Sequence, residues 1–213
     1  MNETLKRALS GLVYVLIMWF GTSFSELSFH ILFIALGVIS TYEMWKLRKG
    51  KSKFFAFLYV LLPFFLIHFF GKIESDNLNS VFDPSIILLI FILTWTFDTF
   101  AYVFGVRFGK TKIMPSISPK KSWEGFTGGF IFNIIASLIT IRYFLEIDNS
   151  IALVISLFLP FTASLGDFIE SYFKRKAGAK DSGKFIPGHG GMLDRMDAFM
   201  ITIPVLYIYL NII

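Results

Sequence analysis

Long apolar segments alternate with short polar ones along almost the whole chain. A helix that crosses a bilayer needs about 20 predominantly apolar residues, because the hydrocarbon core is roughly 30 Å thick and a helix rises about 1.5 Å per residue. Seven segments meet this requirement: residues 6–22, 27–45, 54–71, 85–106, 126–143, 150–169 and 198–213. Isolated lipid-facing strands would leave backbone groups unpaired. The pattern therefore predicts an all-α, polytopic integral membrane bundle of about seven transmembrane helices.

The composition agrees with a membrane setting. Of the 213 residues, 55% are hydrophobic, 27 are phenylalanine and only 16% are charged, and the mean hydropathy is +0.67. A soluble domain usually has about 25% charged residues and could not cover this much apolar surface. No repeat, low-complexity segment or long linker divides the chain, so we expect a single integral-membrane domain over residues 1–213. The absence of cysteine excludes disulfides and cysteine-ligated metal sites.

Positive charge is distributed unevenly among the connections. Of the 20 lysines and arginines, 18 lie in the N-terminus and in the segments 46–53, 107–124 and 170–197. Cytoplasmic loops of membrane proteins carry an excess of these residues. We therefore expect the N-terminus and these three segments in the cytoplasm and the C-terminus outside. The polar chemistry of the chain would then face the cytoplasm.

A few polar residues interrupt the apolar segments. Asp98 lies well inside the fourth one, where an aspartate costs about 2.5–3.5 kcal/mol on insertion scales. It is either a polar clamp between helices or a carboxylate that lines an active-site cavity, and we favour the cavity. Glu43 closes the second segment beside basic residues, and we expect it at the membrane interface, paired with a lysine. His30 and His68 have no second ligand within reach along their helices, so we interpret both as structural histidines.

The first of three polar clusters is GVRFGKTKIMPSISPKKSWEG, residues 105–125. Its glycines and prolines prevent one continuous helix, which predicts a structured loop. The lysines alone could reflect membrane topology. Their combination with hydroxyls and glycine is typical of phosphate binding, and we favour that interpretation. The candidate residues are Ser116, Ser118, Lys120, Lys121 and Ser122.

The second cluster, GDFIESYFKRK, covers residues 166–176 at the end of the sixth apolar segment. A helix would bring residues spaced three and four apart onto one face, here Asp167, Glu170, Ser171 and Lys174. Carboxylates so placed could hold a divalent cation, with the neighbouring basic side chains available to phosphate oxygens. The alternative is a solvated helix end with local ion pairs.

The third cluster is AGAKDSGKFIPGHGGMLDRMD, residues 177–197, whose glycines let a ligand approach the main chain. If the last helix begins near Met192, Asp194 and Asp197 share a face near its N-terminus and could bind Mg²⁺. That N-terminus also favours an anion. His189 has no helically spaced histidine partner, which argues against zinc. We expect it to contact a phosphate or to stabilise the turn.

Basic residues, hydroxyls and glycines suit phosphates, and clustered aspartates suit Mg²⁺. Phosphoryl and nucleotidyl transfer require this combination, because catalysis there is mostly positioning and charge neutralisation. The sequence contains neither GxxxxGK[ST] nor GxGxxG. The residues alone therefore predict a membrane enzyme that transfers a phosphorus-containing group to or from a lipid.

The segment SYFKRKAGAKDSGKFIPGHGGMLDRMD, residues 171–197, resembles the signature of phosphatidate cytidylyltransferases, also called CDP-diacylglycerol synthases. That signature runs S-x-hydrophobic-K-R, four residues, K-D, a small residue, a G/P-x-H-G-G element and D-R-hydrophobic-D. Upstream, DTFAYVFGVRFGK and SPKKSWEG also resemble the family. The similarity covers roughly residues 95–197, which would form the catalytic region with cytoplasmic loops 107–124 and 170–197. Residues 1–90 resemble the family only as hydrophobic spans, and 198–213 would be the final span.

The resemblance implies that the lipid phosphate of phosphatidic acid attacks the α-phosphorus of CTP, giving CDP-diacylglycerol and pyrophosphate, with Mg²⁺ and a monovalent cation such as K⁺. It implies metal ligands at Asp194 and Asp197, followed by Asp167 and Asp181. It implies catalytic roles for Asp98, Lys180, Asp181, His189 and Arg195. It implies substrate binding by Ser118, Lys120, Lys121, Ser171, Lys174, Arg175, Gly190 and Gly191.

By the same resemblance we expect a homodimer in the bacterial plasma (inner) membrane, surrounded by lipid and without a nucleic-acid partner. CDP-archaeol synthases and polyprenol kinases are related alternatives, and the complete HGGMLDRMD sequence argues against the kinases. A transporter is the alternative from another class. Its key residues would lie near mid-membrane on broken helices, whereas the polar clusters here gather at one surface.

Overall fold

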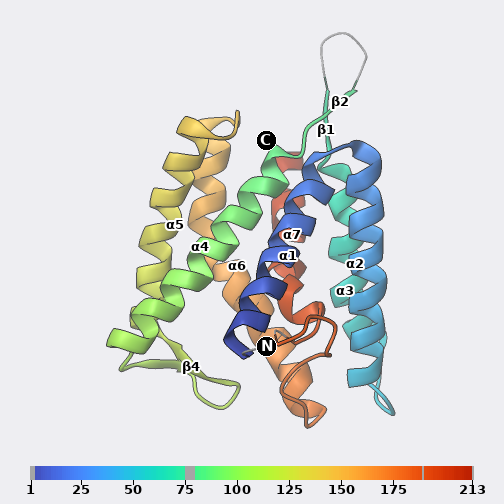
Figure 1. Cartoon of the computed structure of the whole chain (residues 1–213), viewed down its shortest axis with the longest axis vertical. Helices are drawn as coiled ribbons and strands as arrows, with labels where there is room; N and C mark the ends of the chain where they lie inside the picture. The colour runs from blue at the N-terminus through green and yellow to red at the C-terminus, as the bar shows by residue number, and fades with distance from the viewer. Residues whose placement is uncertain (1–2, 75–79, 189, 213) are drawn as a thin grey trace.

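The computed structural model describes residues 3–74, 80–188 and 190–212, and this part of the chain forms a helix bundle (Figure 1). Its α-helices are α1 (Glu3–Ser23), α2 (Glu26–Leu47), α3 (Phe54–Leu66), α4 (Ser85–Phe108), α5 (Trp123–Tyr143), α6 (Asn149–Lys176) and α7 (Leu193–Ile212). A 3₁₀ turn, η1 (Ile67–Phe69), continues α3. Two short antiparallel hairpins pair β1 (Lys72–Glu74) with β2 (Ser80–Phe82), and β3 (Lys112–Met114) with β4 (Ser118–Ser122).

The helices confirm the predicted fold class of an all-α polytopic membrane bundle. Within the described residues, α2, α4, α5, α6 and α7 are long and apolar enough to cross a membrane. The apolar part of α1 and the combined α3 and η1 are shorter, so the count of seven spans stays a prediction, as does the orientation. Large apolar side chains lie exposed on the outside, including Phe24 at 83% and Phe55 at 75%. A surface of this kind suits lipid and not water.

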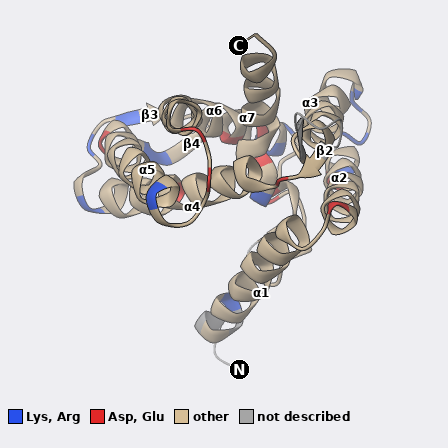
Figure 2. Cartoon of the chain, turned by 90° about the horizontal axis from the view of Figure 1, so that it is seen from above, with Lys and Arg blue, Asp and Glu red and all other residues tan. Residues whose placement is uncertain are grey.

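The bundle has two chemically different ends. The N-terminus, the α2–α3 connection, the β3–β4 hairpin and the segment after α6 lie at one end (Figure 1). The C-terminus and the β1–β2 hairpin lie at the other. Viewed along the bundle, α1 projects away from the remaining helices (Figure 2). The segments that carry most of the basic residues therefore gather at one end, which will be called the N-terminal end.

Helices α6 and α7 extend beyond the apolar segments that predicted them. The predicted sixth span ends at residue 169, whereas α6 continues to Lys176, and the predicted last span starts at residue 198, whereas α7 starts at Leu193. The added turns contain acidic and basic residues that face other helices and one another. A hydropathy pattern ends a span where polar residues begin, although the backbone continues as a helix.

A glycine sets the distance between α6 and α7. Gly166 is buried, and a Cβ added there would lie 2.1 Å from the carbonyl oxygen of Asp197, so the two backbones touch. Tyr59 of α3 donates a hydrogen bond of 2.9 Å to the carbonyl of Gly166. This crossing brings Asp167, the next residue of α6, beside Asp197 of α7.

The predicted loop 107–124 contains the β3–β4 hairpin, which joins α4 to α5. Ser122 caps α5, with its Oγ accepting a bond of 3.2 Å from the N–H of Gly125. The carboxylate of Glu124 accepts bonds from the N–H groups of Lys110 and Thr111, at 3.1 and 3.0 Å. The start of α5 thus holds the hairpin in place beneath α4.

Glu43 and the two histidines, which the sequence presents as isolated polar residues, all have partners in other segments. The prediction that Glu43 pairs with a lysine is wrong: its side chain is only 5% exposed and accepts hydrogen bonds from the start of α7. His30 and His68 have no partner along their own helices, and their Nδ1 atoms lie 2.7 Å apart across α2 and η1. One ring therefore donates to the other, as expected of structural histidines.

Candidate active site

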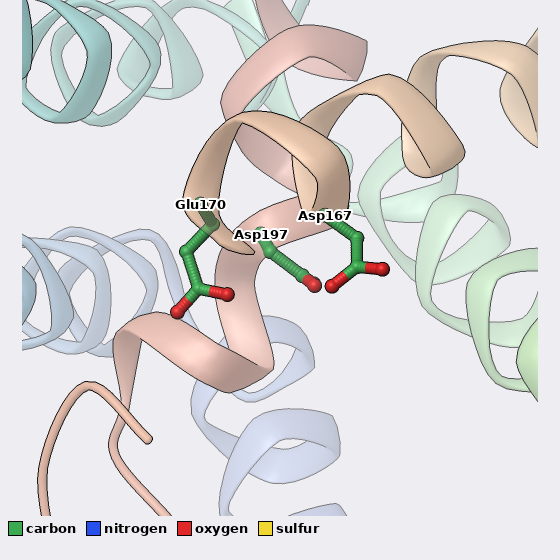
Figure 3. Close-up of side chains that lie close together, drawn as sticks. All are labelled: Asp167, Glu170 and Asp197. Atoms are coloured by element: carbon green, nitrogen blue, oxygen red, sulfur yellow. The ribbon is translucent and has the colours of Figure 1, made fainter. Parts of the chain in front are cut away.

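Three carboxylates meet where α6 crosses α7. Asp167, Glu170 and Asp197 each offer an oxygen within 4.8 Å of the others (Figure 3). Asp167 and Glu170 share a face of α6 because they are three residues apart. The backbone contact at Gly166 brings Asp197 to that face. These three residues will be called the carboxylate cluster.

The carboxylate cluster fits a hard divalent cation. Glu170 is fully buried, and its Oε1 has no hydrogen-bond partner among the described residues. Carboxylates at this spacing repel one another unless a proton or a cation intervenes. Mg²⁺ takes oxygen ligands and commonly combines carboxylates with substrate phosphates. In the part of the chain that the structure describes, no other group of three histidine, aspartate or glutamate side chains lies this close together.

Two lysines flank the cluster on opposite sides. Lys121 of β4 lies 2.6 Å from Asp167 Oδ2. Lys174, one turn after Glu170 on α6, forms ion pairs with Glu170 and with Asp194, the latter at 2.6 Å. Buried charges are tolerated only when they are paired in this way. The cluster is thus anchored to the hairpin on one side and to the α7 N-terminus on the other.

Lys121 is held as a cation. Burial alone would lower the pKa of its ammonium group, but the adjacent Asp167 carboxylate, with smaller effects of Asp98 and Asp197, raises that pKa above its usual range. Lys121 therefore stays charged throughout the physiological range.

A cavity of about 490 Å³ adjoins the cluster between α4, the β3–β4 hairpin and the start of α5. Its walls are largely apolar. The polar residues on them include Asp98, Tyr102, Lys112, Lys120, Lys121 and Ser164. Because Lys121 lines the cavity and also pairs with Asp167, it links the cavity to the cluster. A pocket with apolar walls and lysines at one side suits a molecule that combines a phosphate with an apolar part.

Asp194 has a different environment from the cluster. Its Oδ1 accepts from Lys174, and its Oδ2 accepts from the N–H groups of Ser182 and Gly191, at 2.9 and 2.8 Å. The carboxylate is thus occupied by the segment that precedes α7. Asp181, the other candidate ligand in that segment, is exposed and outside the cluster. Of the four aspartates considered as metal ligands, the structure brings together Asp167 and Asp197.

The remaining candidates are spread around this site. Ser171 is buried and donates to Asp167 Oδ1 at 3.4 Å. Ser118 begins β4 and is half-buried, without lining the cavity. Gly190 adopts φ +85° in the turn before α7, and Gly191 is buried there. His189 lies outside the described residues. The basic candidates on the surface are Arg175, Lys180 and Arg195.

Ser182 and Lys112 of this region were not singled out from the sequence. Glu170 was expected on the face of Asp167 as a carboxylate that could hold a divalent cation, although the resemblance did not place it among the metal ligands. Ser182 is buried between two carboxylates, and Lys112 lines the cavity. The i, i+3 spacing was a usable signal for Glu170. Nothing in the local pattern distinguishes Ser182 from an ordinary turn serine.

Comparison with known proteins identifies the family. The sequence model of the cytidylyltransferase family matches residues 57–213. Phosphatidate cytidylyltransferase of Rickettsia typhi is 36% identical over 213 residues, covering 94% of this chain and 89% of the relative. The protein of the same name from Staphylococcus saprophyticus is 47% identical over 128 residues, covering 58% of this chain and 48% of the relative. The resemblance predicted from residues 95–197 is thereby confirmed, and the chain belongs to the cytidylyltransferase family.

Proposed function

We propose that this protein is a phosphatidate cytidylyltransferase, which makes CDP-diacylglycerol and pyrophosphate from CTP and phosphatidic acid. The observation that carries the proposal is the carboxylate cluster, flanked by Lys121 and Lys174 and adjoining a cavity of about 490 Å³. The relatives that bear this name align over 94% of the chain in one case and over 58% of it in another. The carboxylate cluster can hold a metal ion, the lysines can bind phosphates, and the cavity can accept the apolar part of a substrate.

Asp167, Glu170 and Asp197 would hold the Mg²⁺ ion. An ion held there would supply positive charge to neutralise the nucleotide phosphates and the pyrophosphate leaving group. The proposal replaces two of the ligands expected from the resemblance, Asp194 and Asp181, with Glu170, whose unsatisfied buried oxygen supports the change. We also propose a second, monovalent cation such as K⁺, on the basis of the resemblance to the family alone.

The lysines would bind the lipid phosphate at the cavity. Lys120 and Lys121 line it from β4, and Lys112 lines it from β3, so the ammonium groups can meet a phosphate monoester. Asp98 lies on the same wall and interacts electrostatically with Lys121. A phosphate monoester is already ionised near neutral pH, so its oxygen needs no strong general base. The protein's contribution is to position that oxygen against the α-phosphorus and to neutralise charge.

The lipid substrate would reach this site without leaving the bilayer. The exposed apolar side chains of the helices and the position of the cavity beside α4 support this path. We place the enzyme in the bacterial plasma (inner) membrane, with its N-terminal end facing the cytoplasm and CTP, because the lysine- and arginine-rich segments gather at that end. The proposed assembly is a homodimer.

The decisive assay uses purified protein in detergent or lipid with phosphatidic acid and CTP, with and without Mg²⁺. We expect label from [α-³²P]CTP, and none from [γ-³²P]CTP, to appear in the lipid, and chelation by EDTA to abolish the transfer. Transfer of the γ-label would instead indicate a lipid kinase, and transfer only to ether-lipid phosphates would indicate an archaeol-type enzyme. No labelled lipid from folded protein with any of these substrates would refute the proposal.

Asp197→Asn tests the metal site directly. Removing this carboxylate from the cluster should abolish turnover while leaving expression and Tm nearly unchanged, because the amide has the same shape. Asp148→Asn is the matched control: Asp148 caps α6 far from the cluster, and asparagine is an equally good N-cap. Full turnover in Asp197→Asn would remove that residue from the metal site.

A further inference from the structure

Glu43 connects α2 to the segment before α7. Its Oε1 accepts a bond of 3.1 Å from the N–H of Met192, and its Oε2 accepts bonds from the N–H of Leu193 at 2.9 Å and from Ser182 Oγ at 2.7 Å. The side chain is 5% exposed. Glu43 lies outside residues 57–213, the part that matches the family model. A residue of the N-terminal half therefore contacts the segment that leads to the carboxylate cluster.

The contact is strong on physical grounds. Leu193 is the first residue of α7, and the first N–H groups of a helix have no partner within the helix. A carboxylate at this position is stabilised by those donors and by the positive end of the helix dipole. Bonds between a charged acceptor and N–H or O–H donors are shorter and stronger than neutral ones. A buried carboxylate without its donors would be costly, so the start of α7 is held in one place.

The segment before α7 is folded tightly around this carboxylate. A Cβ added at Gly183 would lie 2.3 Å from Glu43 Oε1, and one added at Gly191 would lie 2.4 Å from Glu43 Oε2. Any side chain at either position would displace the Glu43 carboxylate. The contact with Glu43 of α2 is thus by itself a reason for glycine at both positions.

A continuous set of contacts leads from Glu43 to the metal ligands. Ser182 Oγ lies 2.7 Å from Glu43 Oε2 and 3.0 Å from Asp194 Oδ2. Asp194 pairs with Lys174, and Lys174 pairs with Glu170 of the cluster. Along α7, Asp197 follows Leu193 by about one helical turn, so the position of the helix start sets the position of the Asp197 carboxylate.

We propose that Glu43 is a positioning residue for the metal site: by holding the start of α7 and Ser182, it places Asp197 and Glu170 at the spacing that a divalent cation requires. This inference rests on the proposed function, because the reaction that it concerns is cytidylyl transfer. It gives the N-terminal half of the chain a role in that reaction. Glu43 touches neither substrate nor metal in this role. It acts through α7 and through the Asp194–Lys174 pair.

The test compares Glu43→Gln with wild type in the cytidylyl-transfer assay. Glutamine keeps the size but directs an NH₂ group toward N–H donors, so part of the contact becomes repulsive. Loss of a residue that orients metal ligands typically costs about 10–100-fold in metal affinity or activity. We expect a fall in kcat of this order and a higher Mg²⁺ concentration for half-maximal rate, with KM for phosphatidic acid unchanged. Glu43→Asp should restore part of the loss, and the exposed Glu146→Gln should behave as wild type.

A second measurement separates this proposal from the proposed function. Trypsin cleavage at Lys180 and Lys184, both exposed, and the Mg²⁺-induced rise in Tm require no turnover. Glu43→Gln should be cleaved faster and should show a smaller rise in Tm, even if wild type makes no CDP-diacylglycerol. Ser182→Ala, which removes a single hydroxyl, should also be cleaved faster and show a smaller Mg²⁺-induced rise in Tm. This variant replaces Glu43→Gln in the test if Glu43→Gln does not fold. A lower Tm with wild-type kcat, Mg²⁺ dependence and cleavage rate would overturn the proposal and leave Glu43 a structural residue.

Discussion

Gly166→Ala tests whether the backbone contact between α6 and α7 builds the carboxylate cluster. The new methyl carbon would lie 2.1 Å from the carbonyl oxygen of Asp197. Carbon and oxygen atoms normally approach no closer than about 3.3 Å. The helices must therefore separate by about 1 Å at this point. The Asp197 carboxylate moves with its backbone and away from Asp167.

The magnitude of the effect follows from this displacement. A misplacement of about 1 Å at a catalytic centre can cost on the order of 100-fold in rate. Overpacking of a buried contact usually costs about 1–3 kcal/mol of stability. The hydrogen bond from Tyr59 to the Gly166 carbonyl is strained by the same movement. We expect turnover to fall by about two orders of magnitude, with a folded protein of lower Tm.

The assay measures CDP-diacylglycerol formation across a range of Mg²⁺ concentrations, with Tm determined on the same preparation. Gly21→Ala is the control, because its Cβ would meet only the flexible end of the Leu32 side chain, at 2.9 Å. It should retain wild-type turnover. Wild-type kcat and Mg²⁺ dependence in Gly166→Ala would show that the contact does not set the spacing of the carboxylates, and the reasoning would fail.

Two further predictions concern the lysines beside the cluster. Lys174→Met leaves Glu170 and Asp194 without their cation, so thermal unfolding in detergent should show a loss of about 3–5 kcal/mol, whereas the exposed Lys176→Met should cost little. The pKa of Lys121 is higher in the folded protein than the unfolded-state pKa of about 10.4. Its ion pair with Asp167 is therefore fully present below about pH 10.4, and it is lost only as the pH rises through the higher folded-state pKa. The pH–rate profiles of wild type and Lys121→Arg should therefore have the same shape between about pH 7 and 10; a fall in that range seen only in wild type would contradict the assignment.

Local spacing was enough to predict much of the fold and part of the site. Apolar segments of about 20 residues predicted helices that the structure contains, because lipid leaves the backbone few alternatives. The helical spacing of Asp167 and Glu170 correctly placed two carboxylates on one face. The start of α7 at Leu193 agrees with the expectation of a helix beginning near Met192. Each of these inferences depends on residues within a few turns of one another.

Contacts between distant segments could not be predicted in this way. Glu43 and Leu193 are 150 residues apart, and nothing near Glu43 distinguishes it from a glutamate paired with the adjacent lysines. The contact of Gly166 with Asp197 depends on the crossing of two helices that the sequence treats separately. The β3–β4 hairpin is also short and has a register irregularity, so its strands carry no clear alternating pattern.

The two aspartates of DRMD have different surroundings because they lie at different depths of the same helix. Asp194 is within the first turn of α7, where the preceding segment supplies N–H donors and Lys174 supplies a cation. Asp197 lies almost one turn deeper, where α6 touches α7 and where Asp167 and Glu170 each offer an oxygen within 4.8 Å. Sharing a helix face therefore does not bring both carboxylates into the cluster. The first aspartate fixes the helix start, and the second depends on that fixed start to reach the cluster.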